Sequence, residues 1–348
     1  MHKAAKFADA LLQWFVVHGR HDLPWQLDKT AYRVWLSEIM LQQTQVATVI
    51  PYYQRFLQSF PTIKSLADAD IDTVLQHWQG LGYYARARNL HRAAQIIRDQ
   101  HGGEFPVELD AVLDLPGVGR STAGAILTFA YGQSWPILDG NVKRVLARCF
   151  QVEGWYGQST TMQQLWQLAE QVTPIQHTDD FNQGMMDLGA TVCLKSKPKC
   201  EVCPLSSHCQ SFQQNTQKDY PQKKPVKIKP HKQTWMLLHR YEDQVLLYRR
   251  PPTGIWGGLW SLPEAANQTE IKSWQKINRV TQVPPSSISE NLIRHQFTHY
   301  SLDISVAEFT LERLPEKIAD NENMKFVAFD NIAEFGLPTP VRKILKQP

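Results

Sequence analysis

The sequence has no long apolar run. In 348 residues, no hydrophobic stretch approaches the ~20 residues that a helix needs to cross a bilayer, so the sequence predicts no membrane association. Near the N-terminus, Phe7, Leu11 and Phe15 recur at helical spacing, but Asp9 and Gln13 interrupt them. This pattern indicates an amphipathic helix rather than a secretory leader. We therefore expect a cytoplasmic protein.

The chain also lacks a strong net charge. Its formal charge of +4 is too small to indicate a nucleic-acid partner by itself. The distribution of cations is more informative, because Lys195, Lys197 and Lys199 alternate along one short segment and three arginines fall between residues 86 and 92. A run of charges is more often a solvated surface, so this pattern alone leaves DNA binding open.

Cysteine is scarce and unevenly distributed. Four of the five cysteines fall within seventeen residues at the spacing C-x6-C-x2-C-x5-C: Cys193, Cys200, Cys203 and Cys209. A chain of this length does not need disulfides to stabilise its core, so reduced thiols that bind a metal are favoured over a disulfide framework. Either a zinc ion or a [4Fe-4S] cluster accepts four cysteinates, and spacing does not choose between them.

The length of the chain and the change in residue pattern along it indicate two domains joined by a linker. The apolar fraction of 43% is that of a globular protein, and the length allows about two domains. Helical periodicity dominates the first part of the chain, a segment rich in lysine and proline follows, and short strand patterns come last. We predict a helical domain over 1–217, a basic linker over 218–233 and a smaller α+β domain over 234–348.

A glycine-rich turn separates two helical patterns between about residues 107 and 130. Gly117 and Gly119, in the segment L-P-G-V-G-R, allow the backbone to turn sharply and to approach a ligand closely. The free N–H groups at the start of the following helix favour an anion such as a phosphate. A plain turn between helices is the alternative, and the neighbouring cations favour phosphate binding over it.

Two carboxyl groups occupy informative positions. Asp139 precedes a helical apolar pattern and is a candidate N-cap, where backbone N–H bonds would keep it ionised. Glu38 lies in a helical turn that is apolar on nearly every side, so burial should raise its pKa and make it a general acid near neutral pH. One neutral and one charged carboxyl is the arrangement that cleaves glycosidic bonds. A buried glutamate beside an ordinary cap is the structural alternative.

These motifs together resemble the helix-hairpin-helix DNA glycosylase superfamily, in which the hairpin, the aspartate and the spaced cysteines recur in this order. The resemblance implies a [4Fe-4S] cluster, rather than zinc, in the loop 193–209. The segments L-P-W, S-E-I-M-L-Q-Q-T, G-L-G-Y-Y-A-R-A and L-D-G-N-V-K-R are similar to adenine DNA glycosylases of the MutY type, which remove adenine mispaired with 8-oxoguanine. The implied fold is multidomain, with an all-α helix-hairpin-helix glycosylase domain and its iron-sulfur subdomain followed by an α+β Nudix-like domain.

The resemblance also implies roles for single residues. Glu38 would protonate the adenine, Asp139 would stabilise the cationic sugar, and Asn141 would order the pocket. The residues implied to contact the base or the DNA are Trp25, Gln43, Leu81, Tyr83, Gly117, Gly119, Ser121 and Gln183. Endonuclease III carries a Schiff-base lysine directly after the hairpin arginine, whereas this chain has Ser121 there. A monofunctional glycosylase, which leaves an abasic site in an uncut strand, is therefore implied.

The C-terminal region resembles the Nudix-like domain of MutY proteins through the segment W-G-G-L-W-S-L-P, residues 256–263. No clustered R-E-x-x-E-E carboxylates follow Glu264, so this domain is not expected to be a hydrolase. In the family a Phe-Ser-His loop of this domain checks the opposite strand for 8-oxoguanine. Here the loop reads Phe297-Thr298-His299, in which threonine keeps the hydroxyl and adds a methyl group.

The expected partner is double-stranded DNA with adenine opposite 8-oxoguanine or guanine, bound by a monomer associated with the nucleoid of a bacterium. Two other functions remain open. One is an endonuclease III-like pyrimidine glycosylase and lyase, which Ser121 and the long C-terminal domain disfavour. The other is a non-catalytic DNA-binding module organised by a structural metal.

Overall fold

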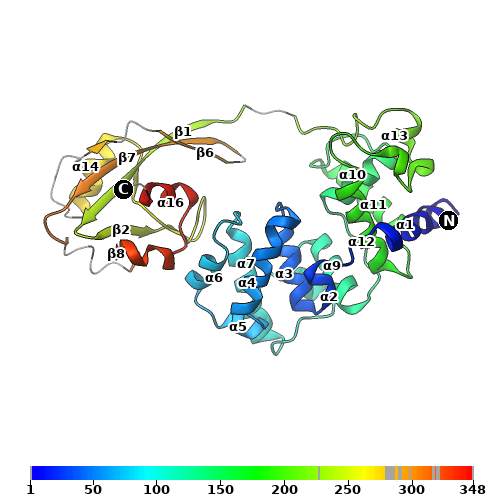
Figure 1. The fold of residues 1–348 in the computed structure, drawn as a ribbon, viewed down its shortest axis with the longest axis horizontal. Coiled ribbons are helices and arrows are strands. Elements are labelled where there is room, and N and C mark those ends of the chain that lie inside the picture. Colours follow the sequence, from blue (N-terminus) through cyan, green and yellow to red (C-terminus); the bar gives the residue numbers. More distant parts are fainter. Residues whose placement is uncertain are drawn as a thin grey trace. The chain divides into compact units, whose positions relative to one another are not determined.

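The computed structural model describes most of the chain, namely residues 2–225, 228–278, 287–288, 292–297, 299–315, 318 and 322–346. The chain forms two compact units (Figure 1): the first is Met1–Ala67 with Arg92–Val226, and the second is Asp68–His91 with Lys227–Pro348. The domain limits expected from the sequence stay a prediction. Among the described residues, no helix has the length and apolar character that crossing a bilayer requires.

The first unit is built from α-helices and short 3-10 turns, as the sequence predicted. In chain order they are α1 (His2–His18), α2 (Pro24–Leu27), α3 (Ala31–Leu41), α4 (Val46–Ser59), α5 (Ile63–Ala67), the end of α7 (Ala85–Gln100), α8 (Leu109–Leu113), α9 (Arg120–Tyr131), α10 (Gly140–Cys149), α11 (Ser159–Val172), α12 (Thr178–Thr191), η1 (Cys200–Val202), η2 (Ser206–His208) and α13 (Gln210–Gln213).

One apolar core packs the N-terminal helix of the first unit against its later helices. Phe7 and Leu11 of α1 pack with buried side chains of α10, α11 and α12, among them Leu146 and Leu188, so α1 lies beside these helices (Figure 1). Leu205, in the cysteine-rich loop, belongs to the same core. Burial of this kind stabilises by about 25 cal/mol per Å² of apolar surface. The core therefore fixes both α10 and the cysteine-rich loop that packs on it.

The predicted hairpin lies between α8 and α9, and its two glycines differ in conformation. Gly117 has a φ of 81°, a left-handed geometry that glycine adopts without strain. Gly119 is the N-cap of α9 in extended backbone, and a Cβ added there would meet nothing within 4 Å. Gly117 is therefore required by the turn itself, whereas Gly119 leaves open space at the start of α9.

In its described residues, the second unit contains a mixed sheet of eight strands. Its elements are α6 (Ile71–His77), the start of α7, β1 (His231–Tyr241), β2 (Gln244–Arg249), β3 (Trp260–Ser261), β4 (Glu264–Ala265), α14 (Gln268–Ile277), β5 (Ser287–Ile288), β6 (Ile293–Gln296), β7 (Ser301–Thr310), β8 (Met324–Ala328), η3 (Phe329–Glu334) and α16 (Thr339–Leu345). The strand order is β3-β2-β1-β7-β5, with β4 beside β1, β6 beside β7 and β8 beside β2. The parallel pairing of β1 with β7 makes the sheet mixed.

Alternation along β1 gives the sheet two apolar faces. Met236 and Leu238 pack with α16, through residues such as Val341. Leu237, between them, points to the other face and packs with Ile271 of α14. Successive side chains of a strand face opposite sides, so a helix can cover each face. This arrangement confirms the predicted α+β domain.

Helix α6 packs on the C-terminal strands, which the sequence did not predict. Asp72 of α6 accepts hydrogen bonds from Arg249 Nη2 (2.9 Å) and from the Trp260 indole N–H (3.3 Å). Gly258, with a φ of 75°, lies where an added Cβ would be 3.7 Å from Leu75. The W-G-G-L-W segment therefore holds α6, and residues 68–91 belong to this unit rather than to the helical one.

A buried histidine should make the second unit sensitive to acid. His239 is fully buried between Trp274 and Phe309, with ring centroids 4.8 and 4.7 Å away, and burial lowers its pKa to about 4. His239 binds a proton near pH 6.5 in the unfolded chain but only near pH 4 in the folded one. Its contribution to the free energy of unfolding is therefore fully present above pH 6.5 and is lost as the pH falls toward 4. This shift in pKa lowers the free energy of unfolding by about 2 kcal/mol between pH 8 and pH 5.

We expect His239→Phe to remove this pH dependence, since a phenyl ring fills the same stack without titrating. Hydrogen exchange of the β1 amides in the full chain, corrected for intrinsic exchange rates, measures the local unfolding free energy at each pH. Equal pH dependence in the wild type and the variant would contradict the assignment to His239.

Candidate active site

A cleft of about 1820 Å³ in the first unit gathers most of the predicted site residues. Its walls come from α2, α3, α9, α10, α12 and the cysteine-rich loop. The predicted residues that line it are Trp25, Glu38, Gln43, Ser121, Asp139, Asn141 and Gln183. Side chains up to 158 residues apart in the sequence thus share one cavity. The hairpin glycines do not line it, although Ser121, directly after the hairpin arginine, does.

Glu38 lies on α3 with apolar neighbours. Trp35 is fully buried and Ile39 nearly so, while Glu38 itself keeps partial exposure toward the cleft. Burial, and secondarily the charge of Asp139, raises the pKa of Glu38 to about 8. A glutamate with this pKa is a carboxylic acid near neutral pH and can donate a proton. The expected direction of its pKa shift is confirmed.

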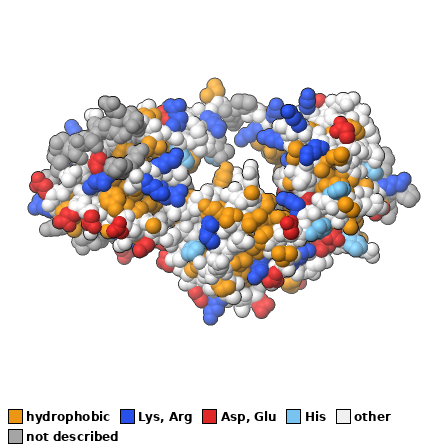
Figure 2. Space-filling model, viewed as in Figure 1, with side chains coloured by type: hydrophobic (Ala, Val, Ile, Leu, Met, Phe, Trp, Pro, Cys, Tyr) orange, Lys and Arg blue, Asp and Glu red, His pale blue; other side chains and the backbone are white. Residues whose placement is uncertain are grey.

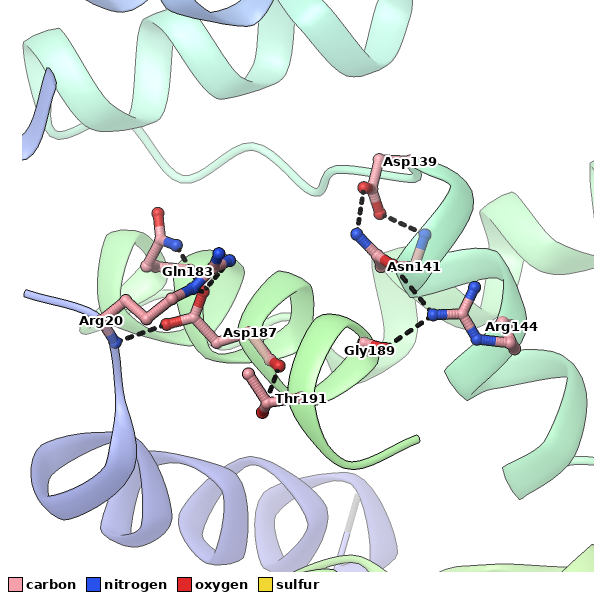
Figure 3. Close-up of polar contacts among 8 residues, drawn as sticks. All are labelled: Arg20, Asp139, Asn141, Arg144, Gln183, Asp187, Gly189 and Thr191. Atoms are coloured by element: carbon pink, nitrogen blue, oxygen red, sulfur yellow. Dashed lines mark hydrogen bonds and ion pairs between the residues drawn. The ribbon is translucent and has the colours of Figure 1, made fainter. Parts of the chain in front are cut away.

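Asp139 caps α10, as its sequence position predicted. One carboxylate oxygen accepts from the Asn141 N–H (2.9 Å) and the Val142 N–H (2.7 Å), and the other accepts from Asn141 Nδ2 (3.1 Å; Figure 3). Burial raises the pKa of Asp139, while these bonds and the charge of Arg144 lower it, and the net direction is upward.

The backbone hydrogen bonds favour the ionised form of Asp139, as expected, but burial outweighs them in its pKa. The expectation that one carboxyl is pushed toward the neutral form and the other toward the charged form is therefore wrong, because burial raises the pKa of both. What separates them is hydrogen bonding, which favours the charged form of Asp139. Since the charge of Asp139 is one cause of the raised pKa of Glu38, Asp139 is the group that loses its proton first.

Arg144 fixes the orientation of Asn141. Its Nη2 donates to Asn141 Oδ1 (2.9 Å) and to the main-chain oxygen of Gly189 (2.7 Å), and its Nε donates to the main-chain oxygen of Cys193 (2.7 Å). With its oxygen held by Arg144, the Asn141 amide turns its NH₂ group toward Asp139 (Figure 3). Sequence reasoning missed Arg144, although a spacing of three residues on a helix places it beside Asn141.

A second polar network, also missed, joins the start of the chain to α12. Asp187 is fully buried and accepts three bonds from Arg20: from the main-chain N–H (2.7 Å), from Nε (2.9 Å) and from Nη2 (2.6 Å). It also accepts from Gln183 Nε2 (2.8 Å; Figure 3). No local sequence signal indicates this network, because Arg20 and Asp187 are 167 residues apart.

Ser121 and Trp25 occupy fixed positions in the cleft wall. The Ser121 hydroxyl accepts from the Leu138 N–H (2.9 Å), directly before Asp139. Trp25 is mostly buried, and its ring meets Tyr53 edge-on with centroids 5.4 Å apart. Ser121 therefore positions the chain that enters the cap of α10, and Trp25 supplies a rigid apolar wall.

Three predicted DNA-contact residues lie in two loops, each in its own unit. Gln43, in the first unit, has a φ of 58°, and Tyr83, in the second, has a φ of 49°. Left-handed backbone at residues other than glycine carries strain and clusters at functional sites. Tyr83 is 49% exposed, whereas Leu81 is only 6% exposed. Tyr83 is thus available to a ligand, while Leu81 could act as a wedge only by leaving its packing.

The four clustered cysteines line one apolar cavity, and all five cysteines of the chain are free thiols. Arg148 Nη1 donates to the sulfur of Cys193 (3.3 Å), and Gln217 Nε2 lies 3.8 Å from the sulfur of Cys200. Within the described residues, no three His, Cys, Asp or Glu side chains are placed to hold a metal ion. Four soft thiols around an apolar space, with a guanidinium beside them, fit the donor chemistry of an iron-sulfur cluster.

The C-terminal loop of the second unit is anchored by Phe297. Its ring packs against Trp256, His295 and Tyr300 at centroid distances of 5.1, 4.6 and 4.8 Å. His299 is exposed, and Thr298 lies outside the described residues. The loop therefore has a fixed aromatic base and an accessible imidazole.

Comparison with known proteins agrees with this fold. Residues 36–171 match the family model of HhH-GPD superfamily base excision DNA repair proteins, and residues 234–347 match that of the NUDIX domain. A thermostable thymine-DNA glycosylase superposes with a TM-score of 0.55 at 29% identity, covering 61% of this chain and 98% of that one. An endonuclease III–DNA complex shares the fold, with a TM-score of 0.52 at 22% identity over 60% of this chain and 94% of its own.

Curated relatives extend over nearly the whole chain. The adenine DNA glycosylase of Buchnera aphidicola subsp. Acyrthosiphon pisum (strain APS) is 41% identical over 342 residues, covering 98% of this chain and 97% of the relative. The adenine DNA glycosylase of Homo sapiens is 35% identical over 369 residues, covering 88% and 67%.

Fold, cleft and relatives together define a helix-hairpin-helix DNA glycosylase, a hydrolase that acts on N-glycosyl bonds and has DNA as its partner. Its C-terminal part is Nudix-like. Within this class, the chain belongs to the adenine DNA glycosylase family.

The electrostatic coupling of the two carboxyls can be measured directly. Asp139→Asn keeps the cap, since asparagine is nearly as good an N-cap as aspartate, but removes the charge. We expect the pKa of Glu38, about 8 in the wild type, to fall in this variant because the repulsion is gone.

Carbon NMR of protein with labelled glutamate carboxyls follows the titration, and Glu38→Gln identifies the resonance. Asp180→Asn is the matched control, since Asp180 also lines the cleft but does not shift the pKa of Glu38. An unchanged pKa in Asp139→Asn would contradict the coupling.

Proposed function

We propose that the protein excises adenine mispaired with 8-oxoguanine or guanine from double-stranded DNA, as a monomer associated with the bacterial nucleoid. The product is an abasic site in an uncut strand. The observation that carries the proposal is the pair of carboxyls in one cleft: Glu38, with a pKa raised to about 8, and Asp139, whose charge contributes to that rise. Membership of the adenine DNA glycosylase family supports the choice of base.

An adenine must leave the duplex to meet these groups. Stacking shields its glycosidic bond, so the enzyme rotates the nucleotide outward at a cost of a few kcal/mol. The cleft has room for a nucleotide, with Trp25 as an apolar wall. Gln43 and Tyr83 are proposed to contact the DNA from their strained loops, and the open start of α9 after Gly119 to bind a backbone phosphate.

Cations along the cleft suit the DNA backbone. The lysines and arginines that line it include Lys29, Arg144, Arg148, Lys195, Lys197, Lys218 and Lys223. In Figure 2, Lys and Arg side chains gather over the part of this unit where α10 and the segment after α13 lie. Phosphate neutralisation supplies affinity that does not depend on base sequence. These positions favour Lys195 and Lys197 of the cysteine-rich loop as DNA contacts rather than as part of a merely solvated face.

Bond cleavage divides the work between the two carboxyls. Adenine is a poor leaving group as an anion, so the Glu38 carboxyl donates its proton to a ring nitrogen as the glycosidic bond breaks. Positive charge then develops on the sugar, and the Asp139 carboxylate, oriented by Asn141, stabilises it. Glu38, now a carboxylate, takes a proton from the water that attacks the sugar carbon. The products are neutral adenine and the abasic strand, and Glu38 regains its proton.

Ser121 supports a monofunctional reaction. A strand-cutting lyase needs an amine that forms an imine with the opened sugar. The position directly after the hairpin arginine carries a hydroxyl, which accepts a bond from the Leu138 N–H. This hydroxyl cannot form an imine, so water completes the reaction.

The Nudix-like domain is proposed to read the opposite base rather than to hydrolyse a diphosphate. Glu264 is held in an ion pair with Arg250 (2.5 Å). The exposed His299, next to the packed Phe297, is proposed to contact an 8-oxoguanine edge, with Thr298 between them in sequence. Recognition of the damaged partner base would then come from this loop.

Cys193, Cys200, Cys203 and Cys209 are proposed to hold a [4Fe-4S] cluster, which the donor set and the nearby Arg148 support. When bound, the cluster cross-links the loop, since four thiolates on one centre restrain its backbone. A restrained loop would fix the residues that reach the site from it, since the Cys193 carbonyl accepts from Arg144 and Lys195 and Lys197 line the cleft. No step of the reaction involves the cluster.

Base release from a duplex with adenine opposite 8-oxoguanine tests the proposal. We expect the wild type to release adenine and to leave the strand intact until alkali is added. Glu38→Gln should lower single-turnover excision by about 10²–10⁴-fold without weakening duplex binding, because an amide has no acidic proton to give. Glu104→Gln, an exposed glutamate outside the cleft, is the control.

Full excision by Glu38→Gln would remove Glu38 from the mechanism. Strand cleavage without alkali would favour the lyase reading, and binding without base release would favour a non-catalytic module.

Recognition of the opposite base can be tested separately. We expect His299→Ala to lower the ratio of excision opposite 8-oxoguanine to excision opposite guanine by about fivefold, the effect of losing one hydrogen bond. The comparison uses the full chain and single-turnover rates, with the exposed Glu312→Ala in the same unit as control. An unchanged ratio would leave the loop without this role.

A further inference from the structure

The last residues of the predicted linker lie against the hairpin of the second unit that carries His299. Strands β6 and β7 form this hairpin, and β1 pairs in parallel with β7 from its first residue, His231, which is opposite Ser301 (Figure 1). The main-chain oxygen of Pro230 extends the pairing by accepting from the Ser301 N–H (3.0 Å). The end of the linker and the base of the loop therefore belong to the same stretch of sheet.

Four polar side chains meet at this junction. Asp303 of β7 is only 4% exposed and accepts from Arg294, its cross-strand partner on β6, through Nε (2.8 Å) and Nη2 (3.1 Å). The His231 ring joins two residues of β7, since Nε2 lies 3.0 Å from the Asp303 carboxylate and Nδ1 lies 2.9 Å from the Ser301 hydroxyl. Ser301 and Asp303 are two positions apart on one strand, so they face the same side of the sheet. One imidazole thus ties the start of β1 to both.

The direction of these bonds follows from the chemistry of the carboxylate. Hydrogen bonds from Arg294 hold the pKa of Asp303 below its usual range, so Asp303 is ionised and only accepts. His231 Nε2 must therefore carry a proton and donate it, and in the neutral imidazole Nδ1 then accepts from the Ser301 hydroxyl. A buried carboxylate that loses one of its donors is costly. His231 is thereby held in one orientation.

Two lysines of the same segment reach the loop itself. Lys229 Nζ donates to the main-chain oxygen of Phe297 (3.3 Å), and Lys232 Nζ lies 4.7 Å from the centre of the Tyr300 ring. Tyr300 in turn packs against Phe297, with ring centroids 4.8 Å apart. Single contacts of an exposed lysine contribute little. The lysines therefore add to a geometry that the bonds of His231 to the buried Asp303 define.

We propose that His231 is a positioning residue for recognition of the opposite base, and that it acts by holding the hairpin that presents His299. Its two bonds fix the first residues of β7, the strand into which the loop runs. Hydrogen bonds weaken steeply as their angle departs from linear, so a side chain that distinguishes two purine edges must be held in place. This inference rests on the proposed function and adds to it a residue outside the loop that sets the preference for 8-oxoguanine over guanine.

His231→Leu tests this role, because leucine fills the space of the ring but makes neither bond. The measurement is single-turnover excision of adenine opposite 8-oxoguanine and opposite guanine, with the full chain. We expect the rate opposite 8-oxoguanine to fall by about threefold to tenfold, the effect of one or two lost hydrogen bonds, and the rate opposite guanine to stay unchanged. The ratio of the two rates should fall accordingly.

Three further variants separate positioning from general support of the sheet. His231→Gln should restore most of the ratio, since its NH₂ group can still donate to Asp303. Ser301→Ala removes only the bond at Nδ1, so it should lower the ratio less than His231→Leu, and it serves if His231→Leu does not fold. Gln233→Leu is the matched control, because Gln233 is exposed on the same strand and takes no part in the bonds described, and its ratio should equal that of the wild type.

The two levels of the proposal fail differently. If the wild type releases no adenine, or His299→Ala keeps the wild-type ratio, the proposed function or its reading loop is wrong and the positioning role falls with it. If His299→Ala lowers the ratio but folded His231→Leu and Ser301→Ala keep it, the positioning role is wrong while the proposed function stands. The same holds if His231→Leu slows excision equally opposite both bases, or if Gln233→Leu lowers the ratio as much.

Discussion

The candidate active site depends on the electrostatic free energy needed to place two ionisable carboxyls in one largely apolar cleft. Burial raises the pKa of both Glu38 and Asp139, and the negative charge of Asp139 raises that of Glu38 further, to about 8. Both cannot easily be charged at once, because like charges in a cavity of low polarity repel strongly. The three hydrogen bonds at the start of α10 decide which one ionises, since they favour the charged form of Asp139.

The surrounding framework keeps this asymmetry in place. The core formed by α1, α10, α11 and α12 fixes the start of α10, and Arg144 links it to Gly189 and to the main chain of Cys193. The cysteine-rich loop is therefore joined to the cap by one guanidinium. A cluster of the kind proposed above would act on the cap only through this loop, by restraining the Cys193 carbonyl that accepts from Arg144.

Local signals in the sequence predicted much of this, and contacts between distant segments account for the rest. The turn at Gly117 and the cap at Asp139 could be predicted because each depends on a few neighbouring residues. The net rise in the pKa of Asp139 could not, since it depends on burial by distant segments. The pair of Arg20 and Asp187 and the packing of α6 on the C-terminal strands likewise join residues more than 160 positions apart.

The pH dependence of single-turnover adenine excision tests the division of labour between the carboxyls most directly. In the proposed mechanism the active form has Glu38 protonated and Asp139 ionised, so the rate constant should fall by about tenfold per pH unit above pH 8, where Glu38 loses its proton. A rate constant that stays level or rises up to pH 9.5, with duplex binding intact, would contradict the assignment of Glu38 as the acid.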